Sequence, residues 1–339
     1  MRYSLVELGP VRQGSGKHDA LEAALAAATE AERLGYHRIW YAEHHNSSTF
    51  ASQDPVSLIA LAARETSTIR VGSGAVLLNH YSPFSVAERF LQLEALFPGR
   101  IDLGLGRATG GPVVDAALQR DRSSQRVDDY AQQVQEILAY YYDAFAVNHP
   151  FVSIEMATGV PGRPQVWVLG SSGSSAGFAG QLGLGYVFAG FINPRTAEDA
   201  LAAHRSQFTA SAFGPSEREA ILALNMVGGA TEEEARRRTW PARLMHRRLR
   251  SGQEPWVSTV AEAEAQLPLT DRMLSGHVGA SGIPMQVCGT VESLRSQVQE
   301  LVERTGATEV MVQDMLVDAG ERSESRAVIA EALAGVDAG

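Results

Sequence analysis

The sequence contains a single cysteine, Cys288, among its 339 residues. One cysteine cannot form a disulfide within the chain, so we expect a reducing compartment. No apolar run approaches the roughly 18 residues that would indicate a membrane span. The first ten residues also lack the basic segment and apolar core of a signal peptide. We therefore expect a cytoplasmic protein that does not bind a membrane.

Basic residues are also in deficit, with 29 Lys and Arg against 39 Asp and Glu and a net charge of −10. Nucleic-acid-binding proteins usually carry a basic stripe that matches the phosphates, so this balance argues against a nucleic-acid partner. The densest run of arginines lies at 236–250 and follows the acidic residues 232–234. That order is typical of a solvent-exposed helix with acidic residues in its first turn.

Short apolar runs alternate with segments of helical period along the chain. The predicted strands are 3–8, 38–41, 69–78, 100–105, 165–169, 186–189, 219–227 and 309–313. The predicted helices are 19–34, one from 54, 83–96, 123–142, 172–182, 196–213, one from 231, 290–304 and 324–333. Apolar strands that alternate with helices indicate a parallel sheet. Eight such units favour a closed (β/α)8, or TIM, barrel that forms one domain over residues 1–339.

One stretch, residues 240–284, does not fit the alternation. It contains four prolines, and its apolar residues show only weak periodicity. A segment of this length between a helix and a strand is usually a functional lid or a mobile loop. A surface insertion without a role is the alternative, and the sequence does not separate the two.

In a (β/α)8 barrel the functional residues follow the carboxyl ends of the strands. The second predicted strand is followed by residues 42–46, which read AEHHN. Adjacent side chains of an extended chain point to opposite sides, and no second cluster at ligand spacing is evident, which argues against a metal site. The histidines are then either hydrogen-bonded structural residues or acid–base catalysts, for which an imidazole titrates near neutral pH. We predict that His44 and His45 are catalytic and that no metal is bound.

Glycine-rich segments lie at the third and fourth strands. Gly72 and Gly74 permit either a tight barrel corner or the close approach of a planar ligand. Residues 103–111 place several glycines around Arg107. This spacing is not a dinucleotide-binding fingerprint, because the third glycine is one residue late and no helix begins there. Arg107 beside bare backbone suits an anion, and a solvent-exposed arginine is the alternative.

The fifth strand runs directly into residues 169–175 (LGSSGSS) and then into a predicted helix. Hydroxyls and free N–H groups at a helix N-terminus bind phosphate. No Gly-Lys-Ser/Thr follows, so the segment is not a Walker A loop. A simple N-cap needs only one serine, so the two serine pairs favour an anion site. Arg126 lies in the predicted helix that follows the fourth strand. Its guanidinium either contacts the same phosphate as Arg107 or lies in solvent.

Together these segments resemble the bacterial luciferase-like flavin-dependent monooxygenases. The opening residues 4–11 are similar to the branch of that family that includes tailoring oxygenases of antibiotic pathways. The similarity is carried by residues 38–45, 69–76, 98–107, 169–175 and 287–292.

The resemblance implies a barrel, usually homodimeric, that uses reduced FMN (FMNH2) and O2. Such an enzyme oxygenates a small organic substrate through a flavin C4a-(hydro)peroxide, and in this branch the substrate is a secondary-metabolite intermediate of the polyketide type. A separate NAD(P)H:flavin reductase commonly supplies the flavin. For a dimer of this chain, the candidate faces are residues 57–64 and 83–96.

The resemblance also assigns site residues. His44 matches the site histidine of the family, and His45 is its neighbour. Gly74 and Ala75 match the contact with the flavin ring, where a non-proline cis peptide can occur. The positions that match or flank the phosphate site are Gly106, Arg107, Arg126, Gly170, Ser171, Ser172 and Ser175.

Ser171 stands where luciferase has an acidic residue beside the phosphate site, which argues against luminescence but not against flavin binding. An F420-dependent oxidoreductase of the same superfamily is the nearest rival function. Its charged cofactor favours more basic residues than the 170–175 segment contains. The sequence is also compatible with a non-catalytic flavin-binding protein and with a metal-dependent barrel hydrolase.

Overall fold

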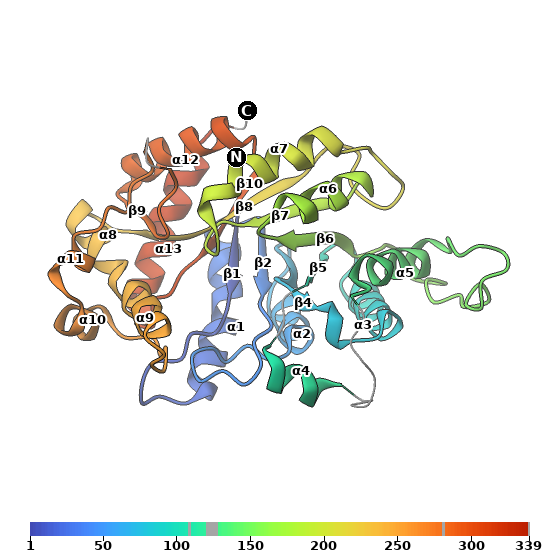
Figure 1. The fold of residues 1–339 in the computed structure, drawn as a ribbon, viewed down its shortest axis with the longest axis horizontal. Coiled ribbons are helices and arrows are strands. Elements are labelled where there is room, and N and C mark those ends of the chain that lie inside the picture. The colour runs from blue at the N-terminus through green and yellow to red at the C-terminus, as the bar shows by residue number, and fades with distance from the viewer. Residues whose placement is uncertain (108–109, 120–127, 280–281, 338–339) are drawn as a thin grey trace.

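The computed structural model describes residues 1–107, 110–119, 128–279 and 282–337 (Figure 1). Within these residues eight parallel strands form a closed barrel, in which β10 pairs with both β1 and β8. This confirms the predicted (β/α)8 fold and its eight strands. The barrel strands are β1 (Arg2–Glu7), β2 (Arg38–Tyr41), β3 (Arg70–Ser73), β5 (Ile101–Gly106), β6 (Gln165–Gly170), β7 (Gly185–Ala189), β8 (Ala220–Gly228) and β10 (Glu309–Gln313).

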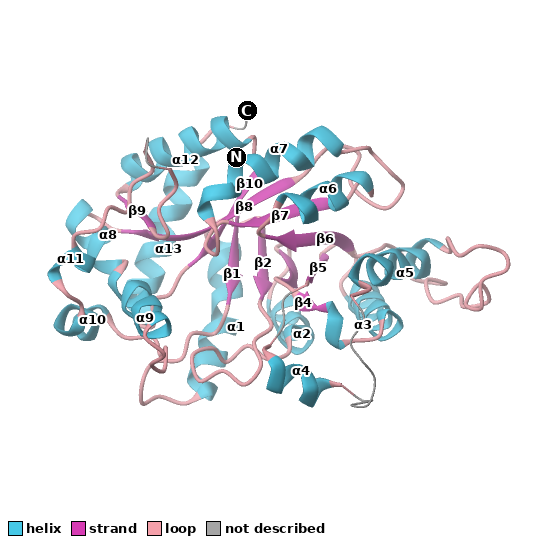
Figure 2. Cartoon of the chain, in the orientation of Figure 1, coloured by secondary structure: helices cyan, strands magenta, loops and turns pink. Residues whose placement is uncertain are grey.

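Helices cover the outer face of the barrel (Figure 2). They begin where the capping residues predict: the side chain of Asp54 accepts a hydrogen bond from Val56 N, and that of Thr231 accepts one from Glu234 N. None of the helices in the described ranges has both the length and the apolar character that a membrane span requires. The helices are α1 (Lys17–Arg33), α2 (Pro55–Glu65), α3 (Pro83–Leu96), α4 (Pro112–Leu118), α5 (Tyr130–Tyr142), α6 (Gly173–Gln181), α7 (Ala197–Gln207), α8 (Glu232–Arg238), α12 (Val291–Thr305) and α13 (Ala319–Ala334).

Several predicted boundaries are wrong. The third strand is interrupted at residues 74–75 and resumes as β4 (Val76–Leu77), although Gly74 N still donates to Tyr41 O of the neighbouring strand β2. Residues 128 and 129 are not helical and α5 begins at residue 130, whereas the predicted start at 123 lies outside the described residues. Helix α7 ends before Phe208, whose backbone is extended. Helix α13 begins earlier than predicted, because the Asp318 side chain caps its first turn.

The predicted insertion, residues 240–284, contains helices rather than one long loop. They are α9 (Trp240–Arg250), α10 (Val260–Gln266) and α11 (Leu269–Arg272), and the short strand β9 (Val287–Gly289) then pairs with the end of β8. Figure 1 shows them at the left edge of the barrel. Trp240 and Leu244 of α9 pack against Val227 at the end of β8. The insertion is therefore anchored to the barrel by apolar contacts, and its role as a lid stays a prediction.

The barrel interior is closed at the amino ends of its strands by a buried ionic cluster. Arg38 donates to Asp102 Oδ2 at 2.8 Å and to Glu309 Oε1 at 2.9 Å, and the side chains of all three are fully buried. Above this cluster, Trp40 and Trp167 meet edge to face with ring centroids 5.6 Å apart. These residues fill the lower half of the barrel, so a ligand has space only at the carboxyl ends of the strands.

Candidate functional site

His44 lies in the loop that follows β2. Its backbone N–H donates to Ser52 O at 2.9 Å, which folds residues 42–52 back over the end of the strand. The imidazole packs on the ring of Phe50, with centroids 4.7 Å apart. Among the described residues, the buried Nδ1 atom of His44 has no hydrogen-bond partner. Burial, with a smaller contribution from His45, lowers the pKa of His44 to about 4. His44 is therefore a neutral base at physiological pH.

His45 points to a different partner. Its Nε2 lies 2.6 Å from Glu43 Oε1, and Glu43 also accepts a hydrogen bond from the Tyr81 hydroxyl at 2.7 Å. Neither Glu43 nor Tyr81 was predicted as a site residue from the sequence. The available signal was the spacing, because residues two apart in an extended segment share a side. The two adjacent histidines thus have different environments.

Gly74, Ala75 and Gly106 lie together at the mouth of the barrel. The peptide bond between Gly74 and Ala75 is cis, as the resemblance predicts. A Cβ atom on Gly106 would lie 3.0 Å from the Cβ of Ala75, and one on Gly74 would lie 3.2 Å from side-chain atoms of Trp40 and Val6. The absence of a side chain lets Gly106 approach Ala75 and lets Gly74 lie close to Trp40 and Val6.

The serine-rich segment forms the turn that enters α6. Ser172 occupies the N-cap position, but its hydroxyl makes no capping hydrogen bond. The hydroxyl instead lies 3.2 Å from that of Ser174, while Ser175 Oγ donates to Ser172 O at 2.9 Å. A Cβ on Gly170 would lie 2.1 Å from Ser175 Oγ, so only glycine fits there. The simple N-cap interpretation is therefore wrong for Ser172, and the exposed N-terminus of α6 keeps N–H groups for a ligand.

Arg107 is exposed just beyond β5 and forms an ion pair with Asp128. It lies near Tyr130: burial raises the pKa of Tyr130, and the charge of Arg107 partly opposes that rise. The Tyr130 ring in turn packs on Phe178 of α6, with centroids 6.3 Å apart. Arg107 is thus connected to α6 through one aromatic residue. Arg126 lies outside the described residues.

The predicted site residues that the structure describes come from the ends of four consecutive strands in the barrel order, β2, β3, β5 and β6. They form three parts at one end of the barrel, namely the histidine loop, the glycine floor around residues 74, 75 and 106, and the serine turn of α6. Half of the ring of strands therefore supplies the whole candidate site, which is the usual arrangement in (β/α)8 enzymes.

Known proteins are similar to this chain in sequence and fold. The profile of the family described as luciferase-like monooxygenase matches residues 1–309. The chain belongs to this family. N-acetyl-S-alkylcysteine monooxygenase of Bacillus subtilis (strain 168) is 31% identical over 333 residues, which cover 98% of each chain. A luciferase-like monooxygenase of Escherichia coli (strain K12) is 32% identical over 95% of this chain and 94% of its own. The crystal structure of apo-MsnO8 superposes with a TM-score of 0.88 at 37% identity and covers 98% of both chains.

As a luciferase-like monooxygenase, the chain is an enzyme that uses O2 to oxygenate a substrate. The family match covers the barrel strands from β1 to β8 and all three parts of the candidate site. The resemblance inferred from the sequence motifs is therefore confirmed at the level of family, fold and reaction class.

The buried His44 makes the stability of this luciferase-like monooxygenase depend on pH. Its pKa is about 4 in the folded chain, against about 6.5 in an unfolded one. Between these values the unfolded chain binds more protons, so the free energy of unfolding falls as the pH drops through this window. We expect His44 to account for a fall on the order of 1–2 kcal/mol between pH 7 and pH 5.

Urea unfolding at a series of pH values measures this contribution. The His44→Asn variant should show a shallower slope between pH 7 and pH 5 than the wild type. An unchanged slope in His44→Asn would show that His44 titrates alike in the folded and unfolded chains.

Proposed function

We propose that the chain binds reduced FMN at the carboxyl ends of β2, β3, β5 and β6 and uses O2 to oxygenate a small organic substrate. The serine turn of α6 carries this proposal. It presents an uncapped helix N-terminus and several hydroxyls to one dianionic group, the binding mode that a phosphomonoester requires. In this proposal Gly170, Ser171, Ser172 and Ser175 surround the phosphate.

Other residues at the mouth fit the rest of the cofactor. We expect Arg107, which is linked to α6 through Tyr130, to add a positive charge there, and Arg126 to add another. The floor formed by Gly74, Ala75 and Gly106 is free of bulky side chains and suits a flat ring system. Reduced flavin supplies the activation of O2, which no amino-acid side chain can provide.

The protein supplies positioning and a dry environment. His44 has a buried nitrogen without a partner among the described residues, so we propose that it exchanges a proton with the reacting groups. Phe50 packs on His44, and Met245 of α9 and Met315 belong to the same apolar cluster as Phe50. This wall excludes water from one side of the histidine. It also favours a substrate with an apolar part.

FMN fits the basic residues of the site better than F420 does. The 170–175 segment contains no basic residue of its own, and the guanidinium of Arg107 is already paired with Asp128. The F420 tail carries more negative charge than a single phosphate and would favour further basic residues there. This difference in charge supports FMN as the cofactor.

The substrate class and the partners are part of the same proposal. The opening residues suggest a polyketide-type intermediate, and the Bacillus subtilis relative is named for an S-alkylated cysteine. Both classes combine an apolar part with a polar one. We further infer that a separate NAD(P)H:flavin reductase supplies FMNH2 and that the chain forms a homodimer. Exposed Leu61 on α2 and Leu96 on α3 support these helices as the dimer face.

Anaerobic titration of the purified chain with reduced FMN and with reduced F420 tests the cofactor. We expect saturable binding of reduced FMN, followed on addition of O2 by oxygen uptake that depends on substrate. A panel of polyketide-type aromatics and alkyl thioethers then tests the substrate class. Binding of F420 without binding of FMN would replace the proposal with the deazaflavin-dependent function. Binding of FMN without uptake on any substrate would favour a flavin-binding protein.

Replacing Gly170 with alanine should weaken the binding of FMN through its phosphate. The added Cβ would lie 2.1 Å from Ser175 Oγ and would force the serine out of the turn. We expect the Kd for reduced FMN to rise at least about tenfold, equivalent to roughly 1.4 kcal/mol. The Kd for reduced riboflavin, which lacks the phosphate, should stay unchanged.

Fluorescence or absorbance titration under nitrogen measures both constants. The control is Gly16→Ala, because a Cβ on Gly16 meets only the backbone of His18 at 3.9 Å. This variant should bind both flavins as the wild type does. Equal weakening of FMN and riboflavin by Gly170→Ala would mean that the serine turn contacts another part of the flavin.

A further inference from the structure

The carboxylate of Glu43 lies where three segments of the site meet. Its side chain is buried, and it accepts three hydrogen bonds. Oε1 accepts from His45 Nε2 at 2.6 Å and from the Tyr81 hydroxyl at 2.7 Å, and Oε2 accepts from Leu77 N at 3.0 Å. Leu77 belongs to β4, two residues after Ala75. One carboxylate therefore connects the histidine loop, the glycine floor and the turn before α3.

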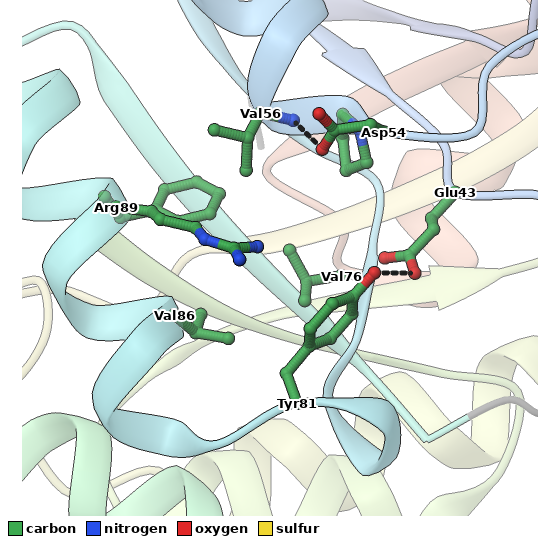
Figure 3. Close-up of a pocket in the computed structure, with 9 residues that line it drawn as sticks. Glu43, Asp54, Val56, Val76, Tyr81, Val86 and Arg89 are labelled. Atoms are coloured by element: carbon green, nitrogen blue, oxygen red, sulfur yellow. Dashed lines mark hydrogen bonds between the residues drawn. The ribbon is translucent and has the colours of Figure 1, made fainter. Parts of the chain in front are cut away.

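The Tyr81 hydroxyl is a permanent donor to this carboxylate. Figure 3 shows Tyr81 and Glu43 pointing toward each other in a small pocket that Asp54, Val76 and Arg89 also line. Burial raises the pKa of Tyr81, and the neighbouring charge of Glu43 raises it further. The hydroxyl therefore keeps its proton at any pH at which the enzyme works.

The hydrogen bond between Glu43 Oε1 and His45 Nε2 decides the tautomer of His45. An ionised carboxylate carries no proton, so it acts only as an acceptor, as it does toward the backbone N–H of Leu77 and the Tyr81 hydroxyl. A histidine that bonds to such an acceptor through Nε2 must carry a proton there, and in the neutral ring Nδ1 then holds the lone pair. Within the described residues, the ion pairs of Glu43 involve only His45.

We propose that Glu43 is a positioning residue of the site. It holds His45 in the tautomer with the proton on Nε2, and through Leu77 it fixes the segment that follows Ala75. The imidazole and the glycine floor therefore keep their relative positions. The catalytic consequence rests on the proposed function, in which His44, His45 and Ala75 face the flavin.

The variant E43Q tests whether Glu43 positions His45, as distinct from only filling space in the fold. The Leu77 N–H cannot change its role, so the amide oxygen must stay opposite it and the amide nitrogen must face His45 and Tyr81. Two donors would then meet, and His45 can keep a hydrogen bond only by moving its proton to Nδ1. The side chain keeps its size, so packing changes little.

Nitrogen-15 NMR of the histidine side chains reports the tautomer in the flavin-free chain, and His45→Asn assigns the signal. We expect a protonated Nε2 in the wild type and in Y81F, which keeps the carboxylate, and a protonated Nδ1 in E43Q. Y36F is the control, because Tyr36 is a buried tyrosine whose hydroxyl donates to Arg326 O. A wild-type tautomer in E43Q would overturn the proposal, and so would a Y81F tautomer that shifts as in E43Q.

Kinetics then test the consequence. In E43Q, kcat should fall roughly 10–100-fold, as when an orienting partner of a site histidine is lost, while the Kd for reduced FMN should change little. Full kcat in a variant whose tautomer has shifted would contradict the positioning role. Failure of the wild type to bind reduced FMN would refute the proposed function instead, and the tautomer comparison would still stand.

Discussion

Replacing Arg38 with methionine should lower the free energy of unfolding by about 3–5 kcal/mol. The guanidinium lies between Asp102 and Glu309 at 2.8 and 2.9 Å, and it stacks on the Trp167 ring at 4.6 Å from the centroid. Its removal leaves two carboxylates in the barrel with too little positive charge. Asp102 keeps Arg70, whereas Glu309 keeps only Arg2 at 3.7 Å among the described residues. Glu309 should therefore account for most of the loss.

Urea unfolding at pH 7 measures the effect, and two further variants identify its cause. The double variant Arg38→Met, Glu309→Gln should recover part of the lost stability, because it removes the unpaired charge. Arg304→Met is the control, because Arg304 pairs with Glu198 and Glu300 on the outer surface. Such surface pairs contribute about 0–1 kcal/mol. No recovery in the double variant would indicate that lost packing on Trp167 explains the effect.

The ionic cluster should also weaken in acid. Burial alone would raise the pKa of Asp102, but Arg38 and Arg70 lower it below its ordinary value of 3.8. The contribution of Asp102 is therefore complete above that ordinary value and is lost as the pH falls through the lowered one. The difference between the wild type and Arg38→Met should accordingly shrink in strong acid.

Replacing His44 with alanine should reduce kcat by about 10²–10⁴-fold, the usual contribution of a general acid–base group. The reason is the state of the imidazole in the folded chain. It is neutral at pH 7, because its pKa is about 4, and its Nδ1 has no partner among the described residues. The Kd for reduced FMN should change little, because the phosphate is proposed to bind at α6.

Oxygen uptake with a substrate from the panel gives kcat, and anaerobic titration gives the Kd. The matched control is His149→Ala. His149 stacks on Phe145 with centroids 4.5 Å apart, as His44 packs on Phe50, but it belongs to the excursion that follows α5. Full turnover in His44→Ala with unchanged flavin affinity would refute the role of His44. A large loss of flavin affinity would make it a binding residue instead.

The fold was predictable because its signal is local. The barrel strands are short apolar runs that alternate with helices, and caps such as Asp54 and Thr231 mark where helices begin. The helices α10 and α11 were missed because they are short and lie beside Pro255 and Pro268, whereas α9 falls within the arginine run 236–250 that already indicated a helix. Their stability comes from packing against the barrel rather than from their own periodicity.

The parts of the site that lie within one short stretch of the sequence were predictable. The serine turn and the histidine pair are contiguous in sequence, and the barrel places them at one end. The role of Glu43 was not predictable, because its partners Leu77 and Tyr81 lie 34 and 38 residues further along the chain. The ionic cluster was missed for the same reason, since Arg38 and Glu309 are 271 residues apart. Such pairings depend on strand order, which the sequence pattern alone does not give.

The ionic cluster has a consequence for how such an enzyme diversifies. Arg38, Asp102 and Glu309 sit at the starts of their strands, whereas His44, the glycine floor and the serine turn lie at or beyond strand ends. A strand of five residues separates the two levels by about 16 Å, and substitutions more than about 10 Å apart that share no partner usually add without interacting. Trp40 is the exception, because it donates to Asp102 and also lies against Gly74. Residues around the cofactor and substrate can thus be exchanged while the opposite end keeps the barrel folded. Directed evolution toward a new substrate should therefore draw its tolerated changes from the segment after β8, which includes α9, α10 and α11, and should leave the charged base intact.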